Sequence, residues 1–515
     1  MKNLLLLLTI ILSITVNAKA IKNNSLVFDE KIYGEKQTEN SIYRFDDVSG
    51  LNKIKIMNIG TEALAARLQL IEKAEKHIEL EYFIFNPDTA GRLMLQALAK
   101  KAKSGVKVRL LVDSSSTVLK LDGYYAQVLK NKNIQLKYYN PTNILQLSSM
   151  NFRNHRKLLS IDNKEAITGG RNIADEYFDL SEEFNFLDRD VMIKGPIVKV
   201  MNKTFENFWT SNLTKLPELP YKINSQIMPG NKEKSEEYAH MHTRYINYMK
   251  KINFANSVFT PNNKDIKALN FINSYSMNLV NNNKLLTCPK LSFATDKEGG
   301  SFKERTKSKK YHKEYRLLRK EISEWIQKVD SEIILDSPYF LNNKRSKAVL
   351  VDLLDKNKEV IISTNSLGST DNILVSTVFN SSVPTYTKRD NFNAYVVKGI
   401  FTEESQVLNE KIRNASWGTH SKTIVFNDKS FMIGTYNIDN RSSFYNTEMA
   451  IFCEGNETLT ADVKDNIEHR MNYSLHLNKK GLPDDGTPLL QRASTSKKLL
   501  YYFLKVPALA VQFLF

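Results

Sequence analysis

The sequence predicts an α/β protein composed of two similar halves, each a sheet with helices on its faces. Helix-like and strand-like patterns alternate along the chain, and an ordered set of polar motifs occurs in both halves. The 515 residues are enough for two or three ordinary domains, and the 42 % hydrophobic content is sufficient to fill their cores.

The elements of the first half follow a helix–strand–helix–strand order. Residues 61–77 carry apolar side chains at helical spacing, and residues 78–84 alternate as a half-buried strand does. A second helical pattern over 90–105 leads into an apolar strand over 106–113. This order favours a sheet covered by helices.

The second half repeats this order. A helix-like and then a strand-like pattern occur over 319–341 and again over 348–366. The strand centres Leu80 and Leu335 lie 255 residues apart. The chain is therefore expected to contain an internal duplication.

Two polar motifs are duplicated together with these elements. His155 and Lys157 recur as His420 and Lys422, 265 residues later. In both copies an asparagine follows the histidine by 17 residues; these are Asn172 and Asn437. The histidines outside this pattern are expected to be ordinary surface or core residues.

Each His–Lys pair is spaced for one binding surface. Side chains two apart on a strand point to the same face, so each histidine and its lysine converge. If the two halves pack about a pseudo-twofold axis, both pairs meet at the seam. Two ammonium groups there would form an anion site suited to a phosphate, and the two asparagines would add amide donors without charge.

Two histidines facing one phosphorus atom suggest a division of labour. A neutral histidine attacks phosphorus and becomes a covalent phosphohistidine, and a protonated histidine gives its proton to the leaving alcohol. A carboxylate on the far ring nitrogen would hold the tautomer, and Asp190 and Glu448 stand at matching places in the repeat for this task. Lysine and asparagine would stabilise the transition state. We expect no metal and no cofactor, because the chemistry requires neither.

The motif HxKxxxxD followed by GGxN, present in two copies, resembles the phospholipase D superfamily. The stretches GGRNIADEYF, DSPYF and NIDNRSSFYNTEM resemble the bacterial cardiolipin synthase C type of enzyme. The resemblance implies two similar mixed-sheet α/β phospholipase D-like domains related by a pseudo-twofold axis, with the active site at their interface. It also implies a metal-free phosphohistidine intermediate and action on phosphodiesters, with the nucleophile and acid roles shared between His155 and His420. Either histidine can be the nucleophile, and we favour His155.

One departure of the second motif copy from the pattern matters. Asp162 ends the first copy and is expected to shape a turn, without a chemical task. The corresponding residue is Asn427, followed by Asp428. Asn427 can still cap a turn, or Asp428 serves after a small shift.

The expected domain organisation has six parts. They are a signal peptide (1–20), an N-terminal extension (21–60), a first phospholipase D-like domain (61–215, motif 150–177), an insert or linker (216–310), a second phospholipase D-like domain (311–480, motif 415–442) and an apolar C-terminal tail (481–515).

The N-terminus has the features of a secretory signal. Lys2 precedes an apolar run over 4–16, and Ala18-Lys19-Ala20 is a cleavage signal, so the mature chain would start near Ile21; an uncleaved anchor is the alternative. In an exported protein Cys288 and Cys453 could form a disulfide, but spacing cannot show that they meet, and two buried free thiols are slightly preferred.

The charge balance predicts an anionic partner. The 73 Lys and Arg exceed the 56 Asp and Glu by a formal charge of +17, which suits nucleic acid, phospholipid headgroups or a phosphorylated small molecule. A basic run over 301–320 is either a solvated linker or a basic face over the active site or against anionic lipid. The apolar tail, in which Pro507 should interrupt any helix, either lies on a membrane or packs on the domain.

Four functions compete for this pattern. The first is phosphatidyl transfer to phosphatidylglycerol, which makes cardiolipin, with phosphatidylethanolamine as a candidate donor. The others are a secreted phospholipase that forms phosphatidic acid, a nuclease, and a scaffold with a relic site. We favour the first, and expect a monomer that binds an anionic membrane surface and is exported to the periplasm, to the outer face of the inner membrane or out of the cell.

Overall fold

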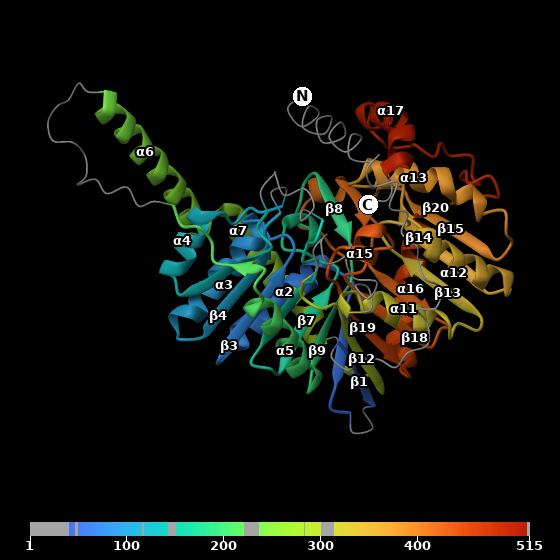
Figure 1. The fold of residues 1–515 in the computed structure, drawn as a ribbon, viewed down its shortest axis with the longest axis horizontal. Helices are drawn as coiled ribbons and strands as arrows, with labels where there is room; N and C mark the ends of the chain where they lie inside the picture. The colour runs from blue at the N-terminus through green and yellow to red at the C-terminus, as the bar shows by residue number, and fades with distance from the viewer. Residues whose placement is uncertain are drawn as a thin grey trace. The chain divides into compact units, whose positions relative to one another are not determined.

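Two nine-stranded mixed sheets form the framework of the computed structural model (Figure 1). The structure describes residues 41–46, 50–115, 118–142, 151–220, 236–282, 284–299 and 314–511. The expected signal peptide, residues 21–40 of the expected extension and residues 301–313 of the basic run lie outside the described residues.

The two sheets have the same strand order and the same strand directions. The first sheet contains, side by side, β10 (Thr214–Lys215), β5 (Ile134–Tyr139), β4 (Lys107–Asp113), β3 (His77–Tyr82), β6 (Leu158–Ile161), β7 (Glu165–Gly169), β9 (Asp190–Lys194), β2 (Lys53–Met57) and β11 (Leu286–Thr287). The second contains β20 (Ser474–His476), β15 (Phe392–Val397), β14 (Glu359–Asn365), β13 (Glu332–Asp336), β17 (Thr423–Phe426), β18 (Ser430–Gly434), β19 (Met449–Glu454), β12 (Lys290–Thr295) and β1 (Ile42–Asp46).

In each sheet the three strands that follow one another through helices are parallel, and the remaining neighbours are antiparallel. The crossover helices are α3 (Thr89–Lys103) and α4 (Gly123–Asn131) in the first half, and α12 (Lys344–Asp355) and α13 (Ile373–Ser382) in the second. The expected duplicated α/β fold is confirmed.

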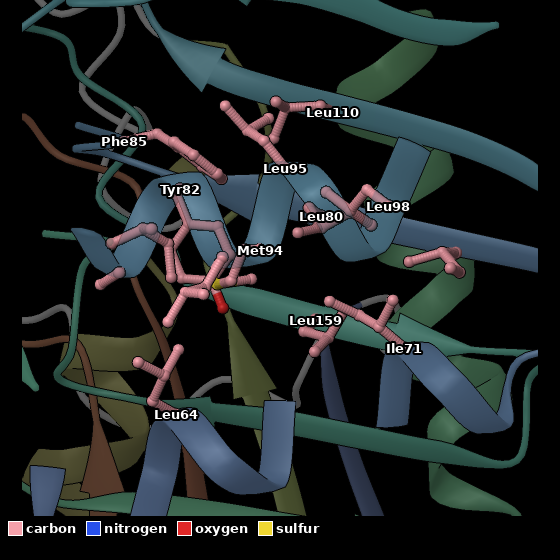
Figure 2. Packing of buried hydrophobic residues seen from close by; sticks show 14 of the residues in the cluster. Leu64, Ile71, Leu80, Tyr82, Phe85, Met94, Leu95, Leu98, Leu110 and Leu159 are labelled. Atoms are coloured by element: carbon pink, nitrogen blue, oxygen red, sulfur yellow. The ribbon is translucent and has the colours of Figure 1, made fainter. Parts of the chain in front are cut away.

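Helices at the predicted positions cover the first sheet. α2 (Gly60–Lys73) presents Leu64 and Ile71, and α3 presents Leu95 and Leu98, toward strand residues such as Leu80 (Figure 2). These leucines are almost fully buried because their helical spacing puts them on one stripe. The side chains between these helices and the first sheet form the first of three main apolar cores.

A second core joins the two halves. Strand residues of both sheets meet there with α5 (Ile197–Thr210) and α16 (Glu457–Asn472). It contains Leu158, Val191 and Ile193 from the first sheet and Val425, Ile433 and Ile451 from the second. Because apolar area removed from water is the main source of cohesion, this core holds the halves in one fixed arrangement, and residues 41–515 form one compact unit.

The stretch expected to be a linker is structured over its described part. It contains α6 (Glu236–Ser257), α7 (Asn263–Phe271), a π-helical turn (Ile272–Ser276), α8 (Met277–Asn282) and strands β11 and β12. Asn262 and Asp265 form a capping box that starts α7, and Asp265 also pairs with Arg92 of α3 at 2.9 Å. The segment expected as an insert or linker thus contains polar helices in its described part, and caps and ion pairs hold them.

The slight preference for free thiols was also wrong. Cys288 and Cys453 form a disulfide, because the antiparallel pairing of β12 with β19 brings their Cα atoms to 5.9 Å. That separation lies in the ordinary range for a disulfide. The bond ties the start of the second half to the strand that carries Glu448 at its end.

The remaining elements are the C-terminal helix and short helices and strands outside the two large sheets. They are β8 (Phe184–Leu187), β16 (Ser416–Thr419), α11 (Leu318–Ile326), α14 (Glu410–Arg413), α15 (Asn440–Phe444), α17 (Thr495–Val511) and the short 3-10 turns η2 (Asp175–Tyr177) and η5 (Val383–Thr385).

The C-terminal helix α17 packs against α13. It runs through Pro507, so the expectation that this proline interrupts the helix was wrong. Proline lacks a backbone N–H, and near the end of a helix this removes only one hydrogen bond. Tyr501 and Leu504 are buried against the domain, whereas Leu499, Tyr502 and Phe503 are exposed. None of the helices in the described ranges has the length and apolar character needed to cross a membrane.

Candidate active site

A small parallel sheet at the seam brings the two motifs together. β8 of the first half pairs with β16 of the second, and the chain leaves this pair at Asp188 and at His420. The His420 N–H donates to the carbonyl of Leu187 at 2.7 Å. On the other side of the seam, the His155 N–H donates to the carbonyl of Thr447 at 3.0 Å. The backbone of each histidine is thus fixed by the opposite half.

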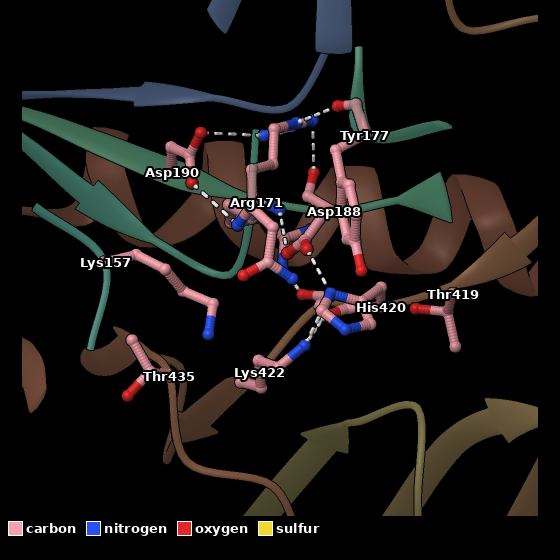
Figure 3. Close-up of polar contacts among 12 residues, drawn as sticks. Lys157, Arg171, Tyr177, Asp188, Asp190, Thr419, His420, Lys422 and Thr435 are labelled. Carbon is pink, nitrogen blue, oxygen red and sulfur yellow. Dashed lines mark hydrogen bonds and ion pairs between the residues drawn. The ribbon is translucent and has the colours of Figure 1, made fainter. Parts of the chain in front are cut away.

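Each imidazole also takes its carboxylate from the opposite half. His155 Nδ1 lies 2.9 Å from Glu448 Oε2, and His420 Nδ1 lies 2.6 Å from Asp188 Oδ2 (Figure 3 shows the second pair). A carboxylate at Nδ1 favours the tautomer with its proton there and leaves Nε2 available to a substrate. Both histidines are almost buried, with 6 % and 5 % exposure.

The expected role of Asp190 was wrong. Its carboxylate pairs with Arg67 at 2.9 Å and with Arg171 at 3.4 Å, away from either histidine. The reason is strand register: Asp190 lies opposite Gly169, just as Ala450 lies opposite Gly434 in the second sheet. The counterpart of Glu448 is therefore Asp188, two residues before Asp190. Sequence spacing does not identify it, because Glu448 follows Gly434 by 14 residues whereas Asp188 follows Gly169 by 19.

The two lysines lie in the same buried cluster. Lys157 Nζ donates to the carbonyl of His155 at 2.7 Å, and Lys422 Nζ donates to the carbonyl of His420. Burial lowers the pKa of Lys157 to about 7, even though Glu448 raises it. Burial likewise lowers the pKa of Lys422 to about 8. Each lysine is therefore poised to gain charge when an anion enters.

The histidines and Glu448 are also shifted by burial. Burial and then the nearby lysines hold the pKa of both His155 and His420 well below the usual value. Burial raises the pKa of Glu448 to about 7, although Lys157 lowers it. Thr435 Oγ1 donates to this carboxylate at 2.5 Å and Ser442 Oγ at 2.8 Å, which holds its orientation toward His155.

The two asparagines border the same cluster. Asn172 Oδ1 accepts from the N–H of Ile84 at 3.3 Å. Asn437 is held through its own N–H, which donates to Ser442 Oγ at 3.1 Å. Its side-chain Oδ1 is buried and has no hydrogen-bond partner within the described part of the chain. The asparagine pair is therefore placed to contact a ligand's polar atoms.

Asp162 and Asn427 occupy equivalent turns far from this chemistry. Asp162 accepts from three successive backbone N–H groups, at residues 75–77, at 2.8–2.9 Å. Asn427 Oδ1 accepts from the N–H groups of Asp330 and Ser331 at 2.9 and 3.2 Å. Asp428 instead pairs with Lys464 on the surface. The Asn substitution thus keeps the acceptor that the turn needs.

Aromatic rings form the walls around the histidines. The ring centroids of Tyr177 and Phe186 lie 5.0 and 4.9 Å from that of His420, and that of Phe83 lies 5.2 Å from that of His155. Such edge-on and tilted contacts favour fixed ring positions. Sequence reasoning missed these residues, because nothing in their local spacing distinguishes them from core aromatics.

An acidic residue next to Lys422 was also missed. Asp371 reaches solvent, and its carboxylate accepts from the Tyr339 hydroxyl at 3.0 Å. The protein around it raises its pKa, while Lys422 and Lys497 lower it. Asp371 therefore interacts electrostatically with Lys422 and is also exposed to solvent.

The duplicated fold and the paired motifs are those of the phospholipase D superfamily of enzymes. The chain belongs to the family described as "Cardiolipin synthase, PLD-like domain", which matches residues 68–209 and 322–471. The first range contains His155 and the second contains His420.

Relatives match over most of the chain. An uncharacterized protein of Helicobacter pylori (strain ATCC 700392 / 26695) is 25 % identical over 87 % of this chain and 83 % of its own. Cardiolipin synthase C of Escherichia coli K12 is 28 % identical over 77 % of this chain and 80 % of its own. The crystal structure of phosphatidylserine synthase from Haemophilus influenzae shares the fold, with a TM-score of 0.59, 14 % identity and coverage of 90 % of this chain and 95 % of that one.

The carboxylates give a first prediction. Asp188→Asn should lower kcat by roughly 10³- to 10⁴-fold, because an amide at Nδ1 no longer favours the required tautomer. Asp190→Asn should instead lower the melting temperature, because it leaves two buried guanidinium groups poorly paired, and should keep kcat within about tenfold when folded. Turnover of bis(p-nitrophenyl) phosphate and circular dichroism measure the two effects. Equal loss of kcat in both folded variants would contradict the assignment.

The pKa shifts predict a narrow pH optimum in kcat/KM. Above pH 7 the activity should fall, because Lys157 loses its proton at about 7 and Lys422 at about 8. Below pH 7 it should fall again, because Glu448 gains a proton at about 7. Lys157→Arg keeps its charge at all these pH values, so it should move the basic limb of the profile to higher pH. An unchanged basic limb in that variant would rule out Lys157 as its source.

Proposed function

We propose that this enzyme transfers a phosphatidyl group from a phospholipid donor to phosphatidylglycerol and so makes cardiolipin. The observation that carries the proposal is the exchange of carboxylates across the seam, which places two oriented imidazoles and two lysines in one buried cluster. Membership of the family and the likeness to cardiolipin synthase C over most of both chains support the lipid substrate.

The first half-reaction forms the covalent intermediate. His155 Nε2 attacks phosphorus, the bond from phosphorus to the leaving alcohol breaks, and His420 gives that oxygen a proton from Nε2. The negative charge of the bound phosphate favours the protonated form of His420 that this step needs. Glu448 stabilises the positive charge that develops on His155. Both lysines balance the charge on the phosphoryl oxygens.

The second half-reaction returns the enzyme to its starting state. His420 removes a proton from a hydroxyl group of phosphatidylglycerol, whose oxygen attacks phosphorus and breaks the bond to His155. The same step with water would give phosphatidic acid. The acceptor is decided by what reaches phosphorus beside His420, where Tyr177 and Phe186 restrict the space.

The proposal includes attachment to an anionic membrane surface through α17. Exposed Leu499, Tyr502 and Phe503 lie on this helix together with exposed Lys498 and Lys505. Apolar and basic side chains on one helix suit the boundary between headgroups and acyl chains of an anionic bilayer.

The position of α17 relates this surface to the site. Lys497 Nζ donates to the carbonyl of Thr370 at 2.9 Å, and the next residue, Asp371, borders Lys422. Lipid that approaches along α17 therefore arrives next to the catalytic cluster.

We also propose export to the periplasm or to the outer face of the inner membrane. The signal-like residues 1–20 support it, and so does the disulfide, because disulfides persist in oxidising compartments and are rare in the cytosol.

Incubation with labelled phosphatidylglycerol, alone and with phosphatidylethanolamine, tests the proposal. Cardiolipin should accumulate on thin-layer chromatography, and phosphorus label should appear on histidine in an acid-quenched, digested sample. His155→Ala and His420→Ala should each abolish turnover. Phosphatidic acid as the only product would show that the enzyme hydrolyses phospholipids and does not transfer the phosphatidyl group. Cleavage of single-stranded DNA without any lipid product would indicate a nuclease.

Membrane attachment predicts an effect confined to vesicles. Replacing Leu499, Tyr502 and Phe503 together by serine should weaken co-sedimentation with phosphatidylglycerol vesicles by at least about tenfold, because exposed apolar area is lost from the contact. Turnover of soluble bis(p-nitrophenyl) phosphate should not change. The matched control replaces three exposed apolar residues elsewhere by serine; they are Leu216, Ile246 and Phe254. Equal weakening in the control would show that α17 is not the contact.

A further inference from the structure

A cavity of about 110 Å³ lies between α11, α12 and the second sheet. Its walls are predominantly apolar and come from all three elements. They include Ile322 of α11, Leu350 and Leu353 of α12, and Leu335, Ile424 and Met432 of the sheet. Most of these side chains belong to the third apolar core, in which α11 and α12 pack on the second sheet.

The two halves differ in the helices that border this cavity. In the first half the corresponding helices α2 and α3 pack directly against each other, whereas α11 and α12 make almost no direct contact. The cause is length: α2 has 14 residues and α11 has 9. The shorter helix leaves part of the sheet without a cover.

The cavity shares residues with the catalytic cluster. Lys422 and the neighbouring Asp439 both line it, together with Ser337, which follows β13. Two partly exposed arginines, Arg319 and Arg345, also contribute to the lining. An apolar space thus lies directly beside the group that is expected to hold the phosphate.

Volume and lining restrict what can bind. An apolar cavity of about 150 Å³ is known to stay dry and to bind benzene, so a slightly smaller one accepts several methylene groups but no headgroup. Polar ligands would lose their hydrogen bonds against these walls. The neighbouring lysine requires that the hydrocarbon belong to an anionic molecule.

We infer that this cavity binds a segment of an acyl chain of the phospholipid whose phosphate is held at Lys422. The inference rests on the proposed function and deepens it, because it assigns a binding site to the part of the lipid that does not react. The chain segment belongs to the phosphatidyl group, so it stays in place during both half-reactions while the headgroup is exchanged.

Two variants on α12 test the site. Val349 lines the cavity, and Ala348, one residue earlier, is exposed and does not. Val349→Trp should lower kcat/KM for a dioleoyl phospholipid in detergent micelles by about tenfold or more, because the loss of two buried methylenes suffices for that factor. For the deacylated glycerophosphodiester the value should stay within about twofold. Ala348→Trp should leave both values unchanged.

A photolabel gives a readout that does not depend on turnover. A phosphatidylglycerol with a diazirine on an acyl chain close to its ester should label peptides that contain α11 or α12 in the wild-type protein, and Val349→Trp should suppress this label. Labelling elsewhere, or equal losses for the acylated and deacylated substrates, would overturn the inference. Labelling of α12 without turnover of any phospholipid would leave the cavity site standing and refute the proposed transfer.

Discussion

Each catalytic histidine is oriented by a carboxylate from the opposite half, and the rest of the structure depends on this exchange. Asp188 holds His420, and Glu448 holds His155. Neither half therefore contains a complete site, although each contains the histidine, lysine and asparagine of the motif. The apolar core between the two sheets matters for catalysis, because it fixes the distance between each histidine and the carboxylate of the opposite half.

The exchange concentrates charge in a buried place. Two lysines, two carboxylates and two imidazoles share an environment in which burial lowers the lysine pKa values and raises that of Glu448. Such a group of charges costs stability unless other interactions offset it. The three apolar cores and the disulfide offset that cost. The resulting site gains positive charge when an anion binds.

Duplication accounts for the paired catalytic residues of the site. The differences between the two copies allow the site to bind the two ends of a substrate in different surroundings. The sheets agree in strand order, but the helices differ. α11 is shorter than α2 and leaves a cavity, and α17 has no counterpart in the described part of the first half. Asp371 and the aromatic residues around His420 add further asymmetry. Symmetric chemistry at phosphorus is thus surrounded by asymmetric walls.

Local spacing alone determined the duplicated fold, the two His–Lys pairs and the asparagines, because strand and helix periods decide which side chains share a face. It also determined Asp162 and Asn427, because a turn needs only one nearby acceptor. Only the tertiary structure distinguished Asp188 from Asp190, since that choice depends on the register between β7 and β9 and on the parallel pairing of β8 with β16. The disulfide and the cavity likewise follow from contacts between distant segments, which no local pattern contains.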